Sequence, residues 1–302
     1  MPNRADSVKQ RGATLIGCAG WSITRQEAAA FPDPGSHLER YAAVFDAVEI
    51  NSSFYRPHQS ATYARWADSV PERFRFSVKL PKAITHEARL SGIDAALSVF
   101  AQQAGALGGK LACVLVQLPP SLSCDTAVAG DFFARLGESF GCTIACEARH
   151  PDWFSDEASA LLQRHGVTRV IADPAKGQEG AHVPTTATIY ARLHGAPRVY
   201  YSSYAPGYLA QLADDMDTHA RQGRTVWCIF DNTASGAALS NALTCALALR
   251  QAPGGAPDPD MPGPYSLVQH SLQVVQLDRL GEVVREAGGQ RQVAVGGAAI
   301  AG

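Results

Sequence analysis

The chain has 302 residues, of which 46% are hydrophobic and 18% are charged, and its formal net charge is -2. This composition can bury one large core, and it provides no broad basic surface of the kind that binds nucleic acid non-specifically. The first residues lack a signal-peptide core and no later apolar run reaches membrane-spanning length, which predicts a cytoplasmic protein without membrane contact. The seven cysteines form no C-x-x-C pair, so we expect reduced thiols.

Apolar runs with strand character alternate with segments of helical periodicity along most of the chain. We expect strands at residues 15–19, 47–51, 74–79, 111–118, 143–147, 168–173, 188–194 and 225–231. We expect helices at residues 59–69, 91–106, 125–139, 155–165, 208–222 and 237–250, and a loop without a helix at 173–188. Eight strands with crossover connections predict an α/β protein, a single-domain (β/α)8 TIM barrel over residues 14–250. An open doubly wound sheet is the alternative, although no G-x-G-x-x-G follows any strand.

The composition changes after Arg250. Residues 252–264 contain five prolines and three glycines, which predicts a linker and a domain boundary. Residues 266–287 fit either a hairpin or a short amphipathic helix, and the tail at 288–302 is expected to be disordered. Residues 251–302 are therefore interpreted as a linker and a C-terminal extension.

Polar side chains gather at the carboxyl ends of the predicted strands, where TIM barrels place their active sites. Side chains alternate between the two faces of a strand, so Glu147 and Arg149 point away from Ile144 and Cys146. The residues at these strand ends are Glu49, Asn51, Lys79, Gln117, Glu147, Arg149, Asp173, Arg192 and His194.

The charges in this set predict acid-base chemistry on an anionic ligand. Lys79, Arg149 and Arg192 suit a phosphate or carboxylate group, and Glu49 or Glu147 with His194 would serve as base and acid. Lys79 has two further interpretations: it forms a Schiff base, or it neutralises Glu49 or Glu147. The opposing interpretation of the whole set is a layer of structural salt bridges.

A dedicated metal site is not predicted, because cations are interleaved with the carboxylates. The only plausible ligands would be His86, His194, Glu49, Glu147 and Asp173. We leave the cofactor and the oligomeric state open.

Further candidates for substrate binding surround these strand ends. His86 follows the third strand, and Asn232 follows the eighth, near the place where barrels often bind phosphate. Aromatic residues that would stack on a sugar or nucleobase, or else simply fill loops, are Trp21, Phe54, Tyr55, Trp153, Tyr200, Tyr201 and Tyr204. Of these, Tyr55 and Trp153 are assigned to the substrate site.

Several ordered motifs point to a known family. They are GCAGW at 17–21, VEINSSFYR at 48–56, FRFSVK at 74–79, ITH at 84–86, QLPP at 117–120, EARH at 147–150, Trp153, RLHG at 192–195 and Asn241-Ala242. Over residues 15–249 the chain resembles the domain-of-unknown-function family 72, also called YecE-like. The resemblance implies a TIM-barrel-like fold similar to sugar isomerases and an abasic-site endonuclease, and it implies no settled reaction. The family usually has two asparagines where this chain has Asp231-Asn232.

The sequence therefore predicts an enzyme, a hydrolase, lyase or isomerase, that binds a polar, anionic, sugar-like or nucleotide-like substrate. Its catalytic candidates are Glu49, Lys79, Glu147 and His194. One alternative is a non-catalytic protein that binds nucleic acid or another anion, and this is disfavoured by the acidic balance of the chain. The other is a metal-dependent hydrolase or isomerase.

Overall fold

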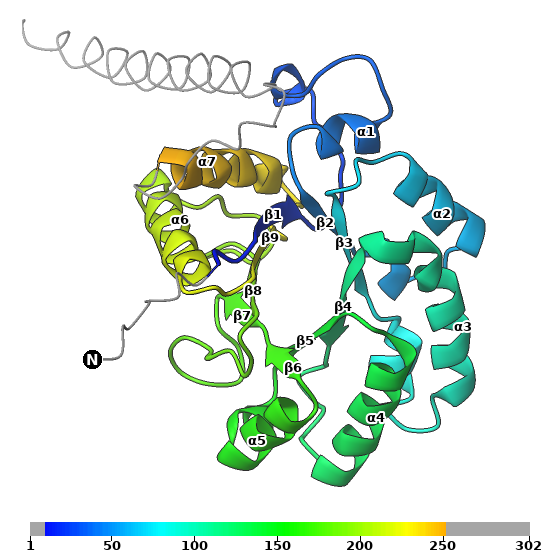
Figure 1. Ribbon diagram of the computed structural model, residues 1–302. Helices are drawn as coiled ribbons and strands as arrows, with labels where there is room; N and C mark the ends of the chain where they lie inside the picture. The colour runs from blue at the N-terminus through cyan, green and yellow to red at the C-terminus, as the bar shows by residue number, and fades with distance from the viewer. Residues whose placement is uncertain (1–9, 252–302) are drawn as a thin grey trace, which may run out of the picture.

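The computed structural model describes residues 10–251. Within these residues, parallel strands alternate with helices that lie around their outer side (Figure 1). The strands are β1 (Thr14–Cys18), β2 (Ala47–Ile50), β3 (Arg75–Lys79), β4 (Leu111–Gln117), β5 (Thr143–Glu147), β6 (Val167–Arg169), β7 (Ile171–Asp173), β8 (Ile189–Leu193) and β9 (Val226–Phe230). The α-helices are α1 (His37–Ala42), α2 (Ser60–Asp68), α3 (Asp94–Ala104), α4 (Thr126–Ser139), α5 (Asp156–Arg164), α6 (Pro206–Arg221) and α7 (Ala237–Gln251).

The strands form two parallel sheets, with the orders β1-β9-β8-β7 and β2-β3-β4-β5-β6. Only Val170 separates β6 from β7, so the single strand predicted at 168–173 is divided into two pieces that belong to different sheets. The α/β class with parallel strands is confirmed, as is the loop without a helix between β7 and β8. The expected closed barrel is not observed as one continuous sheet, because within residues 10–251 no ladder joins β1 to β2 or β6 to β7.

A tyrosine side chain bridges β1 and β2, which have no ladder between them. The hydroxyl group of Tyr41 accepts a hydrogen bond from the Cys18 amide at 2.8 Å and donates to the Ala47 carbonyl at 3.1 Å. Glycine is required beside this contact, since a Cβ on Gly17 would lie 2.1 Å from the Ala47 carbonyl oxygen. The strands thus approach closely without a backbone ladder.

Tyr41 lies on α1, a helix that the hydrophobic pattern did not predict. Its start carries a capping box, in which the Ser36 hydroxyl accepts from the Glu39 amide and the Glu39 carboxylate accepts from the Ser36 amide. That reciprocal pair is a sequence signal for a helix N-terminus. A helix of six residues is too short to show a clear apolar period, which explains why it was missed.

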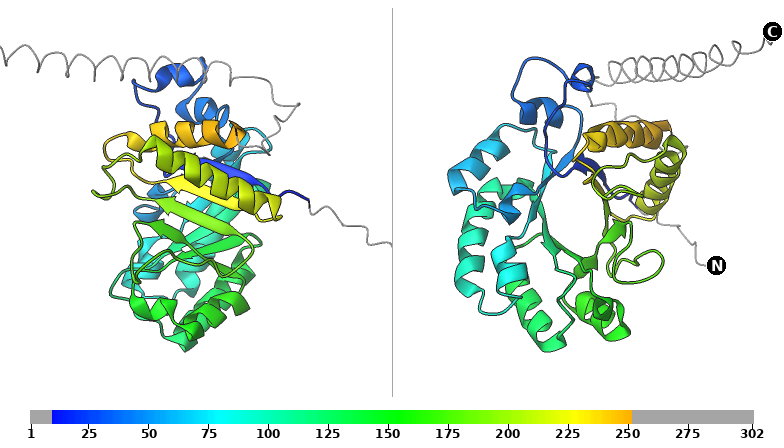
Figure 2. Two further views of the ribbon diagram at one scale, coloured as in Figure 1. Left: turned by 90° about the vertical axis from the view of Figure 1, so that its left-hand side faces the viewer. Right: turned by 180° about the vertical axis from the view of Figure 1, so that it is seen from behind.

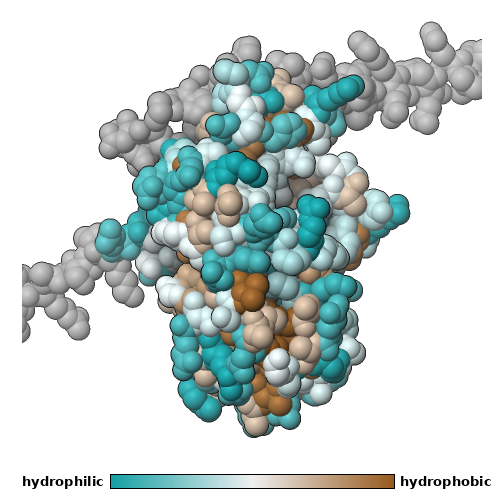
Figure 3. Space-filling model, turned by 90° about the vertical axis from the view of Figure 1, so that its right-hand side faces the viewer, coloured by the Kyte–Doolittle hydropathy of each residue, from teal (hydrophilic) through white to brown (hydrophobic). Residues whose placement is uncertain are grey.

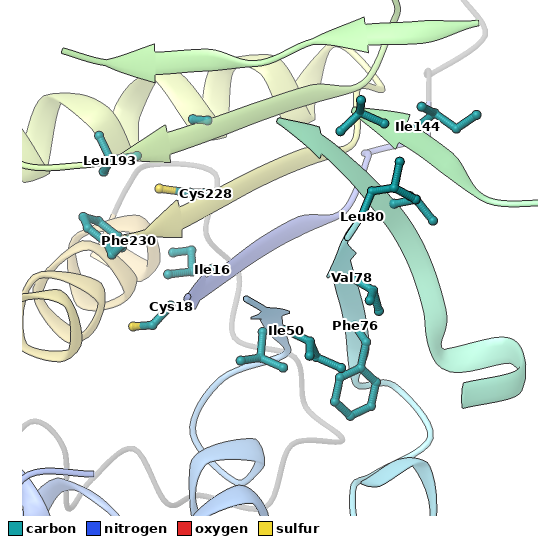
Figure 4. Packing of buried hydrophobic residues seen from close by; sticks show 14 of the residues in the cluster. Ile16, Cys18, Ile50, Phe76, Val78, Leu80, Ile144, Leu193, Cys228 and Phe230 are labelled. Carbon is teal, nitrogen blue, oxygen red and sulfur yellow. The ribbon is translucent and has the colours of Figure 1, made fainter. Parts of the chain in front are cut away.

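Alternating side chains give each strand a face toward the helices and a face toward the interior. Ile50, Val78, Ile144 and Leu193 belong to the large core between strands and helices, and Figure 4 shows several of its members. The opposite faces build a second, smaller apolar cluster of Ala47, Cys113, Leu115, Ala145, Val170, Tyr190, Trp227 and Ile229. This inner cluster forms the floor beneath the polar residues at the strand ends.

The surface is mixed in character. The side formed by α2, α3 and α4 shows polar residues interspersed with small apolar areas (Figure 3), while α6 and α7 lie side by side across from it (Figures 1 and 2). Among the described residues, no helix has both the length and the apolar character needed to cross a membrane. The linker, the hairpin or helix and the tail expected in residues 252–302 lie outside the described part of the chain.

Candidate functional site

Polar side chains from both sheets meet above the apolar floor, at the carboxyl ends of the strands. We call this set the charged cluster. It consists of Glu49 on β2, Lys79 on β3, Gln117 on β4, Glu147 on β5, Arg149 after β5, Arg192 on β8, His194 after β8 and Asp231 after β9. Parallel strands bring these residues together because their carboxyl ends share one edge.

Arg192 lies at the centre of the charged cluster and is fully buried. Its guanidinium group binds Glu49 in a bidentate way, with Nε 3.0 Å from Oε2 and Nη2 2.7 Å from Oε1. Nη2 also donates to Asp231 Oδ2 at 2.9 Å, and Nη1 donates to Glu147 Oε2. Four N–H groups therefore already bind protein carboxylates, which leaves little of Arg192 for the anionic substrate that the sequence assigned to it.

Glu147 is surrounded by donors. Its Oε1 accepts from Gln117 Nε2 at 3.0 Å and from Arg149 Nε and Nη2 at 3.0 and 2.8 Å. Burial alone would raise the pKa of Glu147, but Arg192, His194 and Arg149 outweigh it and hold the pKa well below its usual value. The lowered pKa favours the ionised form of Glu147, which suits it better to stabilising positive charge than to donating a proton.

His194 lies between two carboxylates. Its Nδ1 is 3.1 Å from Asp231 Oδ2, and its Nε2 is 3.3 Å from Glu147 Oε1, although that second contact is not aligned as a hydrogen bond. Burial lowers the pKa of His194, but the interactions with Asp231 and Glu147 outweigh it, so the pKa is raised above its usual value. Compared with a free histidine, this shift favours the protonated form of His194, and a protonated imidazole can act as a general acid.

Lys79 is the exception within the charged cluster, because it has no carboxylate within 4.0 Å among residues 10–251. Its side chain is 4% exposed, and its Nζ lies 4.2 Å from the centre of the Phe54 ring. Burial and the neighbouring Arg192 lower its pKa to about 8, against the opposing effect of Glu49, Glu147 and Asp231. No direct ion pair joins Lys79 to Glu49 or Glu147 within residues 10–251, but both carboxylates act on its pKa, so the interpretation that Lys79 neutralises one of them stays a prediction.

Three other predicted residues follow the ends of β2 and β3. Asn51 follows β2 and its Oδ1 is buried without a hydrogen-bond partner among the described residues. His86 is half-buried, packs edge-on against Phe54 with ring centres 5.0 Å apart, and bonds Thr85 Oγ1 through Nδ1 at 2.8 Å. Tyr55 is 71% exposed and packs edge-on against Phe54, with ring centres 4.9 Å apart.

Three predicted residues are placed elsewhere. Asp173 points to the helix side of β7, where its carboxylate accepts from the Tyr208 hydroxyl of α6 at 3.0 Å. Trp153 is fully buried in the outer core, and its Nε1 donates to the Leu122 carbonyl at 2.9 Å. Asn232 is fully buried and donates to Asn241 of α7 at 2.8 Å and to the Ser202 carbonyl at 2.9 Å.

The physical reasons for these placements differ. Val170 belongs to the inner cluster, so alternation turns Ile171 and Asp173 outward. Trp153 is a large apolar side chain whose single N–H finds a backbone acceptor inside the protein, which makes burial favourable. Asn232 ties the end of β9 to α7 and therefore has a structural task.

The sequence analysis missed three members of this polar network. Asp231 shares the inward face of β9 with Trp227 and Ile229, so alternation was sufficient to find it. Tyr190 and Ser77 lie one layer deeper, where the tyrosine hydroxyl is 3.0 Å from Glu49 Oε2 and 2.7 Å from Ser77 Oγ. Alternation places both side chains on the inward faces of their strands, with Arg192 and Lys79, but only packing across the interior shows that they support Glu49.

The arrangement also bears on metal binding. Within residues 10–251, no three His, Cys, Asp or Glu side chains are arranged to hold a metal ion. The carboxylates of Glu49, Glu147 and Asp231 each bind Arg192 instead. The absence of a metal from the function stays a prediction, and the residues indicate no particular cofactor.

The chain is similar to several known proteins. The model of the family described as "Protein of unknown function DUF72" matches residues 15–264. UPF0759 protein YecE of Escherichia coli is 30% identical over 142 residues, which are 45% of this chain and 52% of that protein. UPF0759 protein YunF of Bacillus subtilis is 24% identical over 235 residues, covering 68% of this chain and 83% of the relative. The match thus spans about half the length of YecE and most of YunF.

Solved structures agree with this assignment. A DUF72 family protein from Thermotoga maritima superimposes with a TM-score of 0.66 at 25% identity, covering 79% of this chain and 99% of the other. A DUF72 family protein from Enterococcus faecalis gives a TM-score of 0.66 at 20% identity and covers 78% and 95% of the two chains. The resemblance predicted from the motifs is confirmed, and the chain belongs to the DUF72 family.

Proposed function

We propose that the charged cluster is the active site of an enzyme that carries out acid-base chemistry on a small, polar, anionic substrate. The substrate class is a sugar-like or nucleotide-like molecule with a phosphate or carboxylate group. The proposal also treats the two sheets as one (β/α)8 barrel, since Val170 joins them on one side and Tyr41 bridges them on the other.

The observation that carries this proposal is the buried ammonium group of Lys79. A buried charge is costly unless it is paired, and the neighbouring Arg192 adds repulsion. An anion bound beside Lys79 would provide the missing partner. A lysine with only a structural task would be expected to contact a carboxylate, as Lys82 contacts Glu87 at 3.0 Å and Lys110 contacts Glu72 at 3.7 Å.

Arg149 is the second cation available to the substrate. Its side chain is 22% exposed, whereas that of Arg192 is fully buried, so Arg149 can contact Glu147 and still face a ligand. Asn51 adds a buried oxygen without a partner, which suits a donor such as a sugar hydroxyl. The cations for the substrate are therefore Lys79 and Arg149, and Arg192 holds the carboxylates in place.

His194 is the group proposed to transfer a proton. Asp231 fixes the ring through Nδ1, and the raised pKa keeps the imidazolium populated near neutral pH. Glu49 and Glu147 are anions fixed by Arg192, so in this proposal they stabilise positive charge rather than exchange protons. The reaction class, whether hydrolysis, elimination or isomerisation, follows from the substrate.

Calorimetric titration of the full chain with sugar phosphates, sugar acids, nucleoside monophosphates and matched neutral sugars tests the proposal. We expect binding of anionic ligands only, and Lys79→Met should weaken it at least about tenfold, which corresponds to about 1.4 kcal/mol. Lys82→Met is the matched control, since Lys82 is an exposed lysine paired with Glu87. Equal binding by the two variants, or tighter binding of the neutral sugars, would refute the proposed site.

A further inference from the structure

We propose that Lys79 is a nucleophile that forms an imine with a carbonyl group, so that the substrate is an aldehyde or ketone that also bears an anionic group. This inference rests on the proposed function, because it names the substrate class for the same site. It makes Lys79 a catalytic residue rather than only a cation that binds charge.

The surroundings of Lys79 suit the neutral amine. The lysine side chain is 4% exposed, its Nζ lies on the Phe54 ring at 4.2 Å, and within the described residues no carboxylate within 4.0 Å holds its proton. Such a setting penalises the ammonium form, which is the usual way in which a lysine becomes a nucleophile near neutral pH. The lowering of its pKa to about 8 agrees with this geometry.

Imine formation at Lys79 needs only protons, which groups already in the site can supply and accept. The lone pair of neutral Nζ attacks the carbonyl carbon, the carbonyl π electrons move to the oxygen, and a proton passes from the nitrogen to that oxygen, so that a neutral carbinolamine results. One further proton, supplied by His194, allows the hydroxyl group to leave as water while the nitrogen lone pair forms the carbon–nitrogen double bond. The product is an iminium ion and one water molecule, and no oxidant or reductant takes part.

The charged cluster provides what these steps need. His194 carries a proton under the influence of Asp231 and Glu147 and can supply it to the leaving hydroxyl group. The three carboxylates that bind Arg192 also lie close enough to Lys79 to influence its titration, so they stabilise the positive iminium that replaces the neutral amine. Arg149 binds Glu147 through Nε and Nη2, and its partly exposed guanidinium group can still contact the anionic group of the substrate.

The chain offers a sharp contrast among its lysines. It contains five, namely Lys9, Lys79, Lys82, Lys110 and Lys176. Lys82 pairs with Glu87, Lys110 donates to the Ala67 and Val70 carbonyls at 2.7 and 2.8 Å, and Lys176 is exposed. Selective chemistry at Lys79 can therefore be recognised by mapping very few peptides.

The experiment uses pyridoxal 5'-phosphate, which has both an aldehyde and a phosphate group, on the full-length protein at neutral pH. Borohydride then reduces any imine to a stable amine, and peptide mass spectrometry locates it. We expect at least about tenfold more label on Lys79 than on Lys82 or Lys176, and protection of Lys79 by inorganic phosphate. Pyridine-4-carbaldehyde, which lacks the phosphate, should label Lys79 more weakly.

Two variants separate this inference from the proposed function. Lys79→Arg keeps the positive charge, so it should retain phosphate binding in calorimetry while losing the label, and Lys79→Met should lose both. Circular dichroism checks that each variant is folded. Label spread over the exposed lysines, or phosphate binding by the wild type without any reducible imine, overturns the nucleophile and leaves the anion site standing. Absence of phosphate binding in the wild type refutes the anion site itself.

Discussion

Replacing Lys79 by methionine should make the protein more stable, although the residue lies in the proposed active site. Burial and Arg192 lower the pKa of Lys79 from 10.5 to about 8. Each pKa unit corresponds to about 1.4 kcal/mol, so the charged lysine costs the folded state at most about 3.5 kcal/mol at pH 7. Methionine keeps the unbranched chain that packs on Phe54 and removes this cost. Chemical denaturation should show an increase in unfolding free energy of about 1 to 3 kcal/mol.

The dependence on pH provides the check on the cause. Because the folded-state pKa lies below the unfolded one, the unfolded chain holds more protons between pH 8 and 10.5, and wild-type stability rises relative to the variant across that window. The advantage of Lys79→Met should therefore be complete below pH 8 and disappear by about pH 10.5. Lys82→Met should change stability by less than about 0.5 kcal/mol. If Lys79→Met is destabilised at pH 7, or its difference from wild type does not depend on pH, the reasoning is refuted.

Three further predictions concern the other members of the site. Arg192→Met should lower the unfolding free energy by about 3 to 5 kcal/mol, because it leaves buried carboxylates unpaired. Adding Glu49→Gln to this variant should restore part of the lost stability. A loss below about 1 kcal/mol for Arg192→Met would mean that Arg192 is not a structural centre. Because the pKa of His194 is raised in the folded state, the stability that His194 contributes is complete below its unfolded-state pKa of 6.5 and is lost as the pH rises through its folded-state pKa. The unfolding free energy of His194→Gln, measured by denaturation at several pH values, should not show this decline. Equal pH profiles for the variant and the wild type would contradict the prediction. Asp173→Asn should leave anion binding in calorimetry within about twofold of wild type, since Asp173 bonds Tyr208 outside the charged cluster, and a large loss would return Asp173 to the site.

Much of the fold was predictable because strand alternation and turn residues act locally. The strands at 47–51 and 143–147 and the helices at 125–139 and 155–165 were expected within a few residues of where they lie. The break between β6 and β7 and the missing ladder between β1 and β2 depend on contacts between distant segments, such as Tyr41 with Cys18 and Ala47. A single sequence contains no signal for those contacts.

The sequence predicted most of the residues that form the site, but not how they pair. Alternation placed Glu49, Lys79, Glu147, Arg192 and His194 on inward faces, and the structure brings them into one network. What the sequence left undecided was the pairing, because three cations and three carboxylates can combine in many ways. Only the three-dimensional arrangement shows that Arg192 binds Glu49 and Glu147, and that its third carboxylate is Asp231 rather than Asp173.

Because the three carboxylates bind Arg192, Lys79 has no direct carboxylate partner among the described residues and can bind a ligand. The aspartate at position 231, where the resemblance to the family implies an asparagine, contributes the third carboxylate on Arg192 and the partner of His194. We therefore expect this chain to hold its histidine proton more firmly than relatives with an amide at that position, because a carboxylate stabilises the imidazolium and a neutral amide does not.

The most direct measurement is a crystal structure of the full chain soaked with a phosphorylated aldose such as ribose 5-phosphate. The account predicts electron density at the carboxyl ends of the strands, with the phosphate contacting Arg149 and the sugar carbon at Lys79 Nζ, and with the contacts between Arg192 and its three carboxylates unchanged. Density bound at another surface, or a phosphate that displaces the carboxylates from Arg192, would contradict it.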